Sequence, residues 1–308
     1  MNRGVLLALG AAGISGVSVF VNSYGVKAFA AASADATTYT TAKNAVAAAV
    51  LVIVLGAARN RDRAIVTRPT RRRDVAGLAA VALVGGSLPF VLFFEGLAHV
   101  AAGPVQAQFL NKTLVVWVAL LAVTLLGERL GPLQLGAVAL LVVGQASLAG
   151  GVGRTFTMPF GRGEALILAA TVLWAVEVVL AKALLRDVSP PTVMLARMVL
   201  GSVLLLGWAV GTGRAAALVA MDARQWGWVL LTGGLLAGYV ATWLVALSLA
   251  PAVNVTAVLV AAVPVTAVLQ SLVQGAPLRP VALSLVVAGC ALASMATLAR
   301  RDRTSVPG

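Results

Sequence analysis

The chain of 308 residues is 60% hydrophobic and only 11% charged, whereas soluble domains carry about a quarter charged residues. This composition excludes an ordinary water-soluble protein, because a single soluble core stops growing near roughly 250–300 residues and could not bury so much apolar sequence. The formal net charge of +13 argues little for nucleic-acid binding, because the arginines lie between apolar runs and no stacking aromatic residues are interleaved with them.

Ten apolar runs follow one another along the chain, each close to the 20 or so residues that a helix needs to cross a bilayer. Polar residues, Gly or Pro separate them, and the connections are short except for the basic segment 59–74. The sequence therefore predicts an all-α integral membrane protein with ten transmembrane helices. The runs cover residues 5–29, 37–58, 75–98, 104–126, 131–149, 163–184, 191–210, 226–247, 252–273 and 279–299.

Lysine and arginine residues near the ends of these runs predict the orientation, because cytoplasmic segments carry an excess of them. With the N-terminus inside, the inner segments hold fourteen such residues and the outer segments hold five. Half of the fourteen lie in the segment 59–74. We therefore expect both termini to be cytoplasmic, in a cell membrane of the bacterial inner-membrane type.

A weak internal repeat relates residues 1–149 to residues 150–308. Each half contains five predicted helices, an odd number, so the two halves must cross the membrane in opposite directions. Such inverted repeats are typical of secondary transporters, which bind their substrate near the bilayer midplane between the halves. The matched positions are Asn22 with Glu177, Lys27 with Lys182, Lys43 with Arg197, Gly127 with Gly275 and Pro132 with Pro280.

The segment from Phe109 to Gly144 resembles the signature of EamA-type proteins of the drug/metabolite transporter superfamily. The resemblance is carried by its Leu-Asn-Lys and Gly-Glu-Arg-Leu stretches and by the spaced glycines that follow. The second half repeats the pattern more loosely through Gly275 and Gly289, and Ala276 stands where the family's glutamate is expected. The resemblance implies a ten-helix fold of two five-helix halves and the export of metabolites such as amino acids.

The chain lacks the sequence motifs by which common enzymes and nucleotide-binding proteins are identified. It has no GxxxxGK[ST], HExxH or CxxC sequence, and a serine triad would have to use the single histidine, His99. We therefore expect no enzyme, no cofactor and no metal ion. The single cysteine, Cys290, lies in an apolar run and is expected to be a core residue.

The most informative residues are ionisable side chains inside the predicted spans, because a charge within lipid is costly. Lys112 lies about 12 Å into its span and needs a carboxylate, either from the protein, for which Glu95 is the candidate, or from a substrate. Glu177 is either a proton carrier or the permanent partner of Arg197. Lys112, Glu95 and Glu177 are therefore the first candidates for a substrate or proton site.

Neutral polar and aromatic side chains inside the spans complete the candidate substrate site. Amide side chains can bind a polar ligand or join helices by hydrogen bonds, and aromatic side chains can line the cavity of an amphiphilic substrate or simply pack. The candidates are Asn22, Gln108, Asn111 and Asn254 among the amides, and Trp174, Tyr239 and Trp243 among the aromatic residues.

These features predict a secondary active transporter that exports a small amphiphilic metabolite such as an amino acid by alternating access. The proton gradient is the expected energy source, since carboxylates lie in the spans and no ATP-binding motif occurs. Basic residues in the first two helices of each half, together with Lys112, favour an anionic or zwitterionic ligand over the hydrophobic cations of a multidrug efflux protein. A non-transporting scaffold or sensor is the remaining alternative, and isolated midplane polar residues argue against it. The expected partners are the small-molecule substrate, a proton and the lipid bilayer.

Overall fold

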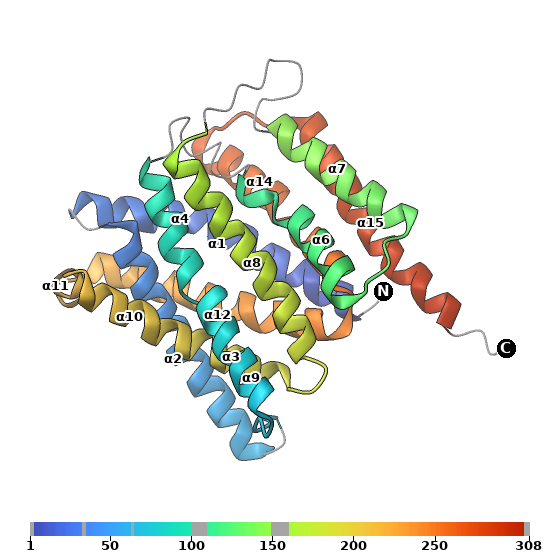
Figure 1. Ribbon diagram of the computed structural model, residues 1–308. Coiled ribbons are helices and arrows are strands. Elements are labelled where there is room, and N and C mark those ends of the chain that lie inside the picture. The colour runs from blue at the N-terminus through green and yellow to red at the C-terminus, as the bar shows by residue number, and fades with distance from the viewer. Residues whose placement is uncertain (1–2, 33–34, 63–64, 100–109, 149–159, 305–308) are drawn as a thin grey trace.

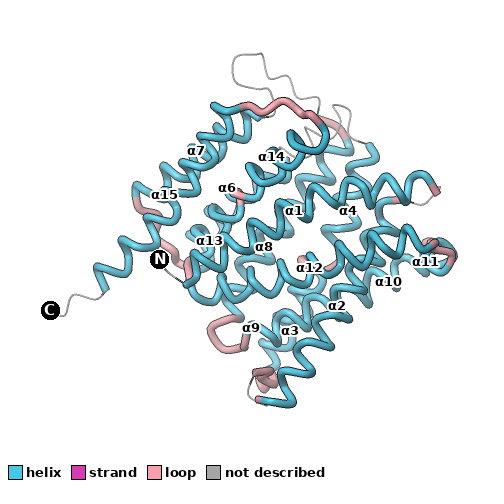
Figure 2. Tube along the Cα trace, turned by 180° about the vertical axis from the view of Figure 1, so that it is seen from behind, coloured by secondary structure: helices cyan, strands magenta, loops and turns pink. Residues whose placement is uncertain are grey.

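The structure is a computed structural model that describes residues 3–32, 35–62, 65–99, 110–148 and 160–304. The regular secondary structure of these residues is helical, and the helices lie side by side in one bundle (Figure 1). The view from behind shows helices on that side as well, many of them joined by short loops (Figure 2).

The bounds of the helices follow the order of the apolar runs. The first half of the chain contributes α1 (Arg3–Ala31), α2 (Ala36–Arg61), α3 (Arg72–Val84), α4 (Leu88–His99), α6 (Leu114–Leu126) and α7 (Pro132–Leu148). The second half contributes α8 (Arg162–Leu184), α9 (Pro190–Leu195), the π-helical turn η1 (Ala196–Leu200), α10 (Gly201–Gly211), α11 (Ala215–Val219), α12 (Ala223–Leu249), α13 (Ala252–Leu259), α14 (Ala262–Gln274) and α15 (Pro280–Thr304).

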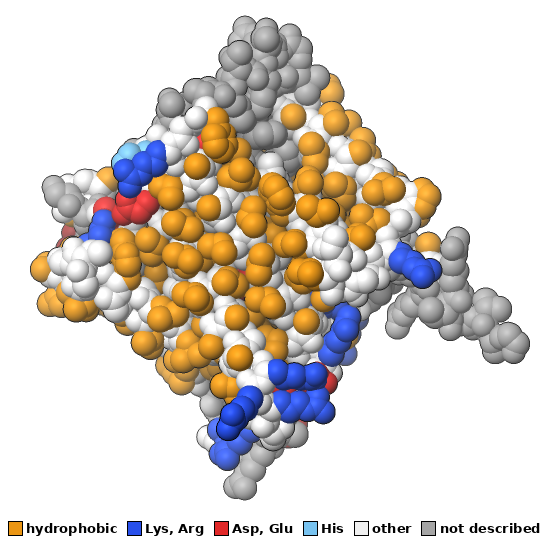
Figure 3. Space-filling view, viewed as in Figure 1, with side chains coloured by type: hydrophobic (Ala, Val, Ile, Leu, Met, Phe, Trp, Pro, Cys, Tyr) orange, Lys and Arg blue, Asp and Glu red, His pale blue; other side chains and the backbone are white. Residues whose placement is uncertain are grey.

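Eight helical segments of the described chain are long and apolar enough to cross a membrane, and two shorter apolar helices, Leu110–Leu126 and Pro132–Leu148, accompany them. The predicted span 104–126 is described only from Leu110 onward. Hydrophobic side chains cover the middle of the face in Figure 3, while Lys and Arg side chains gather along its lower edge. An apolar outer surface of this extent suits lipid rather than water, in agreement with the predicted all-helical membrane fold.

The predicted span 75–98 is not one continuous helix, because a three-residue turn that begins at Gly85 separates α3 from α4. A Cβ atom at Gly86 would collide with the carbonyl oxygen of Arg197 and would lie 3.0 Å from the Cα atom of Gly201. The glycines therefore let the backbone of this turn touch the backbone of η1 and α10 directly. Periodicity does not predict such a break, since the apolar run continues through it.

The repeat-matched residues Gly127 and Gly275 have the same backbone conformation. Each follows the last residue of an apolar helix, α6 or α14, with a φ of 67°. Glycine adopts this left-handed conformation at helix ends without strain. The matched prolines, Pro132 and Pro280, then begin α7 and α15. The same turn chemistry therefore recurs at matched positions of the two halves.

Contacts between the two halves of the chain are reciprocal. Helix α1 packs against α12 and α14, and helix α8 packs against α4 and α6, so each half places its first helix against helices of the other. Helices α7 and α15 pack against each other, and a Cβ atom at Gly289 would lie only 3.1 Å from the Ala137 carbonyl oxygen. This interlocking buries polar residues of α2, α8 and η1 inside the bundle.

Candidate functional site

Glu177 and Arg197 form an ion pair in the interior of the bundle, with side chains only 3% and 5% exposed. Arg197 Nε donates to Glu177 Oε1, and Arg197 Nη2 donates to Oε2 at 3.3 Å. The same Nη2 lies 3.2 Å from the carbonyl oxygen of Gly85, to which it also donates. The pair therefore packs against the turn between α3 and α4 and is hydrogen-bonded to it through Gly85. Of the two roles predicted for Glu177, partnership with Arg197 is the arrangement found in this structure.

Two aromatic residues of α12 lie next to this ion pair. The guanidinium carbon of Arg197 is 5.6 Å from the centre of the Trp243 ring, within the range of cation–π attraction. Tyr239 stacks on Trp243 with ring centroids 6.0 Å apart. Trp243 is buried and Tyr239 is half-buried, and Trp243 Nε1 donates to none of the described residues. The structure thus brings the candidates Glu177, Tyr239 and Trp243 into one cluster.

A second polar cluster joins α1, α2 and α12. Asn22 Oδ1 lies 2.7 Å from the Tyr39 hydroxyl and 3.5 Å from Lys43 Nζ. The Tyr39 hydroxyl also lies 2.8 Å from Thr232 Oγ1, so its single hydrogen is shared between two acceptors. Lys43 is buried, with its Nζ atom 5.3 Å from the centre of the Tyr39 ring. The candidate Asn22 is therefore the hydrogen-bond partner of a buried lysine.

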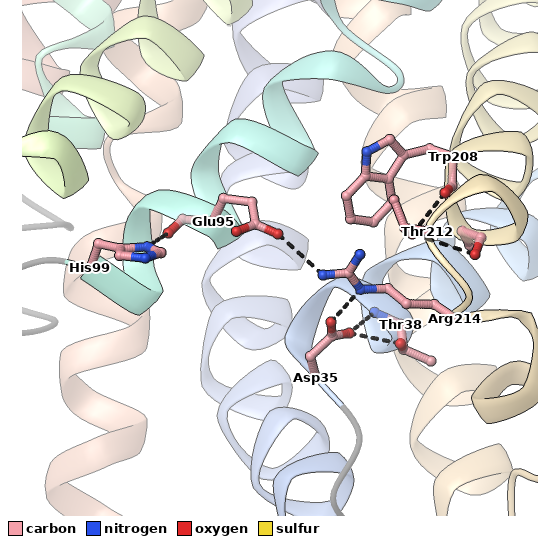
Figure 4. A network of polar contacts seen from close by, with 8 residues as sticks. Asp35, Thr38, Glu95, His99, Trp208, Thr212 and Arg214 are labelled. Atoms are coloured by element: carbon pink, nitrogen blue, oxygen red, sulfur yellow. Dashed lines mark hydrogen bonds and ion pairs between the residues drawn. The ribbon is translucent and has the colours of Figure 1, made fainter.

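Arg214 joins the two halves of the chain at one end of the bundle (Figure 4). Its Nε donates to Asp35 Oδ2 at 2.6 Å, and its Nη2 donates to Glu95 Oε1 at 3.3 Å. The guanidinium carbon lies 4.4 Å from the centre of the Trp208 ring. Glu95 therefore has Arg214 as its ion-pair partner, in place of the Lys112 considered from the sequence. Only the fold brings these residues together.

A cavity of about 290 Å³ adjoins this contact. Partial burial alone would raise the pKa of Asp35, but hydrogen bonds from Thr38 and Arg214 outweigh it and hold that pKa below its ordinary value. Asp35 also accepts the backbone N–H of Thr38 at 2.7 Å and so caps α2. Asp35 therefore gives the cavity a carboxylate that is ionised at neutral pH. Its lining residues are Asp35, Ala36, Thr37, Phe94, Glu95, Leu97 and Arg214.

Different contacts join the halves at the opposite end of the bundle, where α12 ends and α13 begins. Glu128 accepts the backbone N–H groups of Ala252 at 2.8 Å and of Val253 at 3.4 Å, and a carboxylate is favourable at a helix N-terminus. Within the second half, Lys182 Nζ donates to the carbonyl oxygens of Leu247 at 2.7 Å and Ala250 at 2.8 Å at the same end of the bundle. Both side chains thus satisfy backbone groups that the helices leave unpaired at their ends.

Lys112 and Asn111 lie at the start of the helical segment that leads into α6. Both side chains are half-buried, and neither has a hydrogen bond or an ion pair with another described residue. Gln108 lies outside the described residues. The ammonium of Lys112 is therefore open to a ligand as far as the described part of the chain is concerned.

The remaining two candidates make helix-to-helix contacts. Trp174 is half-buried, with its ring centroid 5.4 Å from that of Phe90 on α4. Asn254 is buried, accepts from Gln134 Nε2 at 2.6 Å and donates to Thr297 Oγ1 at 2.6 Å. Since both polar atoms of the Asn254 amide are engaged, it joins α13 to α7 and α15.

Asp35, Tyr39 and Arg214 are not among the residues predicted from the sequence. Asp35 carries a local signal, because an aspartate at the start of an apolar run is a favoured helix N-cap. The contacts of Arg214 with Glu95 and of Tyr39 with Thr232 join residues 119 and 193 positions apart. No local pattern reports contacts at such separations.

The family model described as the EamA-like transporter family matches residues 2–149 and, again, residues 161–298. The chain belongs to the EamA-like transporter family. The predicted resemblance is thereby confirmed, and EamA membership together with the apolar helices makes this a multi-pass membrane protein of a transporter family. No curated protein matches the chain.

Solved structures share the fold of this EamA-family chain. One crystal structure, described only as that of a protein, matches 99% of this chain and 100% of its own with a TM-score of 0.73 and 17% sequence identity. Identity this low establishes the shared fold alone. The chemistry of the EamA member described here therefore has to be argued from its own residues.

Proposed function

We propose that this EamA-family protein is a secondary active transporter that exports a small amphiphilic metabolite such as an amino acid. Its ten apolar segments cross the cell (inner) membrane as an inverted repeat of two five-helix halves, residues 1–149 and 150–308. Both termini lie in the cytoplasm, on the side of the basic segment 59–74. The substrate binds between the halves, which expose it to one side of the membrane at a time.

The observation that carries this proposal is that the halves are joined by different polar contacts at the two ends of the bundle. At the outer end, Arg214 of the second half pairs with Asp35 and Glu95 of the first. At the inner end, Glu128 of the first half caps α13 of the second. Alternating access needs one set of contacts to open while the other holds, and a scaffold would need neither to open.

The proposed substrate site lies in the interior between these two sets of contacts. Lys112, Asn111 and Asn22 offer polar groups from the first half, and the half-buried aromatic rings of Trp174 and Tyr239 offer apolar surface from the second. An amphiphilic solute needs both kinds of surface. Gln108, outside the described residues, stays a candidate from the sequence alone, while Trp243 supports Tyr239 by stacking.

We propose that Glu177 or Glu95 carries the coupled proton, because each carboxylate forms an ion pair with an arginine. Protonation would remove the negative charge and so release Arg197 from Glu177 or Arg214 from Glu95. Release of Arg214 weakens the outer contact, and release of Arg197 frees the turn at Gly85. A proton taken up at either carboxylate is thereby linked to movement of the halves.

Transport by the purified protein in liposomes tests this proposal, with radiolabelled amino acids and an imposed pH gradient. We expect flux of at least one amino acid above that of protein-free liposomes. Glu95→Gln or Glu177→Gln should abolish gradient-driven flux while exchange of the same solute stays measurable. If both variants keep gradient-driven flux, proton coupling through these carboxylates is wrong. Flux of hydrophobic cations alone would favour multidrug efflux, and no flux of any solute would favour a scaffold or sensor.

A further inference from the structure

The two halves of the chain bring the same pair of matched positions into contact but give the pair different charges. In the second half, Glu177 on α8 forms an ion pair with Arg197 on η1. In the first half, the matched positions are Asn22 on α1 and Lys43 on α2, and Lys43 Nζ lies 3.5 Å from Asn22 Oδ1. One contact joins an acid to a base, whereas the other joins an uncharged amide to a base.

The second-half pair is complete in itself. Both oxygens of Glu177 accept from Arg197, whose guanidinium also donates to Gly85 and lies against the ring of Trp243. The negative and positive charges balance, and the side chains are almost fully enclosed. The pair therefore needs no charged ligand to balance it.

The first-half pair leaves Lys43 without a negative charge. Its ammonium has three N–H donors, and the one hydrogen bond that it makes, to Asn22 Oδ1, is long and shares its acceptor with the Tyr39 hydroxyl. Among the described residues, no carboxylate lies within ion-pair distance of Lys43. A buried charge without a partner is costly, and Lys43 is only 7% exposed.

Lys43 cannot relieve this cost by reaching water at the end of its helix. It lies seven residues beyond Ala36, the first residue of α2, which corresponds to a depth of about 10 Å. Its ammonium turns inward, toward α1 and the Tyr39 ring, rather than along the lipid face. On the α1 side of the cluster, Asn22 and its hydrogen-bond partner Ser18 are half-buried, whereas Lys43 and Tyr39 are buried.

We propose that Lys43 binds the carboxylate of the transported molecule, which takes the position against Lys43 that Glu177 takes against Arg197. This inference rests on the proposed transport function and deepens it by naming the substrate class, a carboxylate-bearing solute. The amide of Asn22 lies beside Lys43 and orients the bound carboxylate. A glutamate in place of Asn22 would instead occupy Lys43 itself and compete with the substrate. In the second half, Glu177 already occupies the matched position beside Arg197, so no substrate carboxylate binds there.

Thermal unfolding of the purified full-length protein tests this assignment without knowledge of the natural substrate. The probe is sodium acetate, compared with sodium chloride at the same concentration and with acetamide as an uncharged molecule of the same shape. We expect acetate to raise the Tm by about 2 °C or more relative to chloride, and acetamide to have no effect. Lys43→Met should lose the acetate response. Lys182→Met is the matched control and should keep it, because Lys182 binds backbone carbonyl groups.

Asn22→Glu provides an independent test that does not depend on the stability of Lys43→Met. The substitution places a carboxylate where the matched position of the second half has one. We expect a higher Tm in chloride and no further response to acetate, because the new side chain occupies the site. A lower Tm that acetate still raises would overturn the assignment, as would an acetate response that persists in Lys43→Met or is missing from the unsubstituted protein.

The outcome separates this assignment from the proposed transport function. Flux of an uncharged or cationic solute in liposomes, with no acetate response in unfolding, would leave transport standing and remove Lys43 from the substrate site. An acetate response that depends on Lys43, with no flux of any solute, would leave the carboxylate site standing and remove transport.

Discussion

Arg197 binds both carboxylate oxygens of Glu177, 20 positions earlier in the chain, and holds the turn at Gly85 with the same guanidinium. A buried ion pair is a poor source of net stability, but removal of one partner leaves the other charge uncompensated. The intact pair is therefore expected to contribute little to the free energy of unfolding, whereas loss of either side chain should lower that free energy strongly.

Glu177→Gln should destabilise the protein by about 3–5 kcal/mol, since it leaves the Arg197 guanidinium buried without a counter-charge. Arg197→Met in the same chain should restore a large part of this loss, because the unpaired charge is then removed as well. Chemical denaturation in detergent measures the free energies of unfolding of four proteins: the unsubstituted chain, Glu177→Gln, Arg197→Met and the double variant. Additive losses in the double variant would show that the two side chains do not act as a pair.

Gly86→Ala should destabilise the fold by about 1–3 kcal/mol, as overpacking does in other cores, because the added Cβ atom would collide with the carbonyl oxygen of Arg197. Gly56→Ala on α2 is the matched control, since a Cβ atom there has no neighbour within 4 Å. The control should be neutral or stabilising by up to about 1 kcal/mol through its helix propensity. Equal Tm values for the two variants would contradict the close contact of the α3–α4 turn with η1.

Arg214→Gln should open the cavity beside Asp35 and Glu95, because the only cation that the described residues place between these carboxylates is lost. A cysteine at Thr37, a buried residue that lines the cavity, reports the opening through its rate of reaction with a membrane-impermeant maleimide. We expect this rate to rise about tenfold or more, equivalent to the loss of about 1.4 kcal/mol from a closed state. The exposed Arg224 supplies the control: Arg224→Gln should leave the rate unchanged, and an equal rise in both variants would mean that Arg214 does not hold the cavity closed.

Acidification should remove the contribution of Asp35 to stability. Because its pKa is held below the ordinary value in the folded protein, its contribution is complete above the unfolded-state pKa of about 3.9 and is lost as the pH falls through the lower folded-state value. Asp35→Asn keeps an N-cap side chain for α2 but removes the charge. The Tm difference between the unsubstituted protein and Asp35→Asn should be constant above about pH 5 and shrink below about pH 4. A Tm difference that grows on acidification would contradict the predicted sign of this effect.

Lys112→Met should weaken substrate binding by about 2–4 kcal/mol if the Lys112 ammonium pairs with a charged group of the substrate. The free energy of unfolding should change little, since no described carboxylate pairs with Lys112 and none loses its partner. Binding isotherms for the transported solute and denaturation of the empty protein measure the two effects separately. Undiminished affinity in a stable Lys112→Met protein would remove Lys112 from the site.

The sequence by itself determined the membrane class, the order of the helices and the family. Apolar runs of the required length, separated by polar or Gly/Pro breaks, are local properties of the chain, and the helices follow the order of these runs. Gly127 and Gly275 are predictable for the same reason, since each ends its helix with a turn that depends on the residue type alone. The matching of Lys43 with Arg197 likewise identified two positions with related surroundings.

The tertiary structure alone decided which charges meet. The sequence offered Glu95 as a partner for Lys112, but the fold gives Glu95 to Arg214 from the other half, 119 positions away. It also decided that Arg197 has a carboxylate partner while Lys43 has only the amide of Asn22. The periodicity of a segment indicates which of its faces is buried. It does not indicate which side chain from a distant part of the chain will contact that face. Ion pairs form between whichever groups the packing brings within a few ångströms, so the charge balance of the interior follows from the packing of α1, α2, α8 and η1.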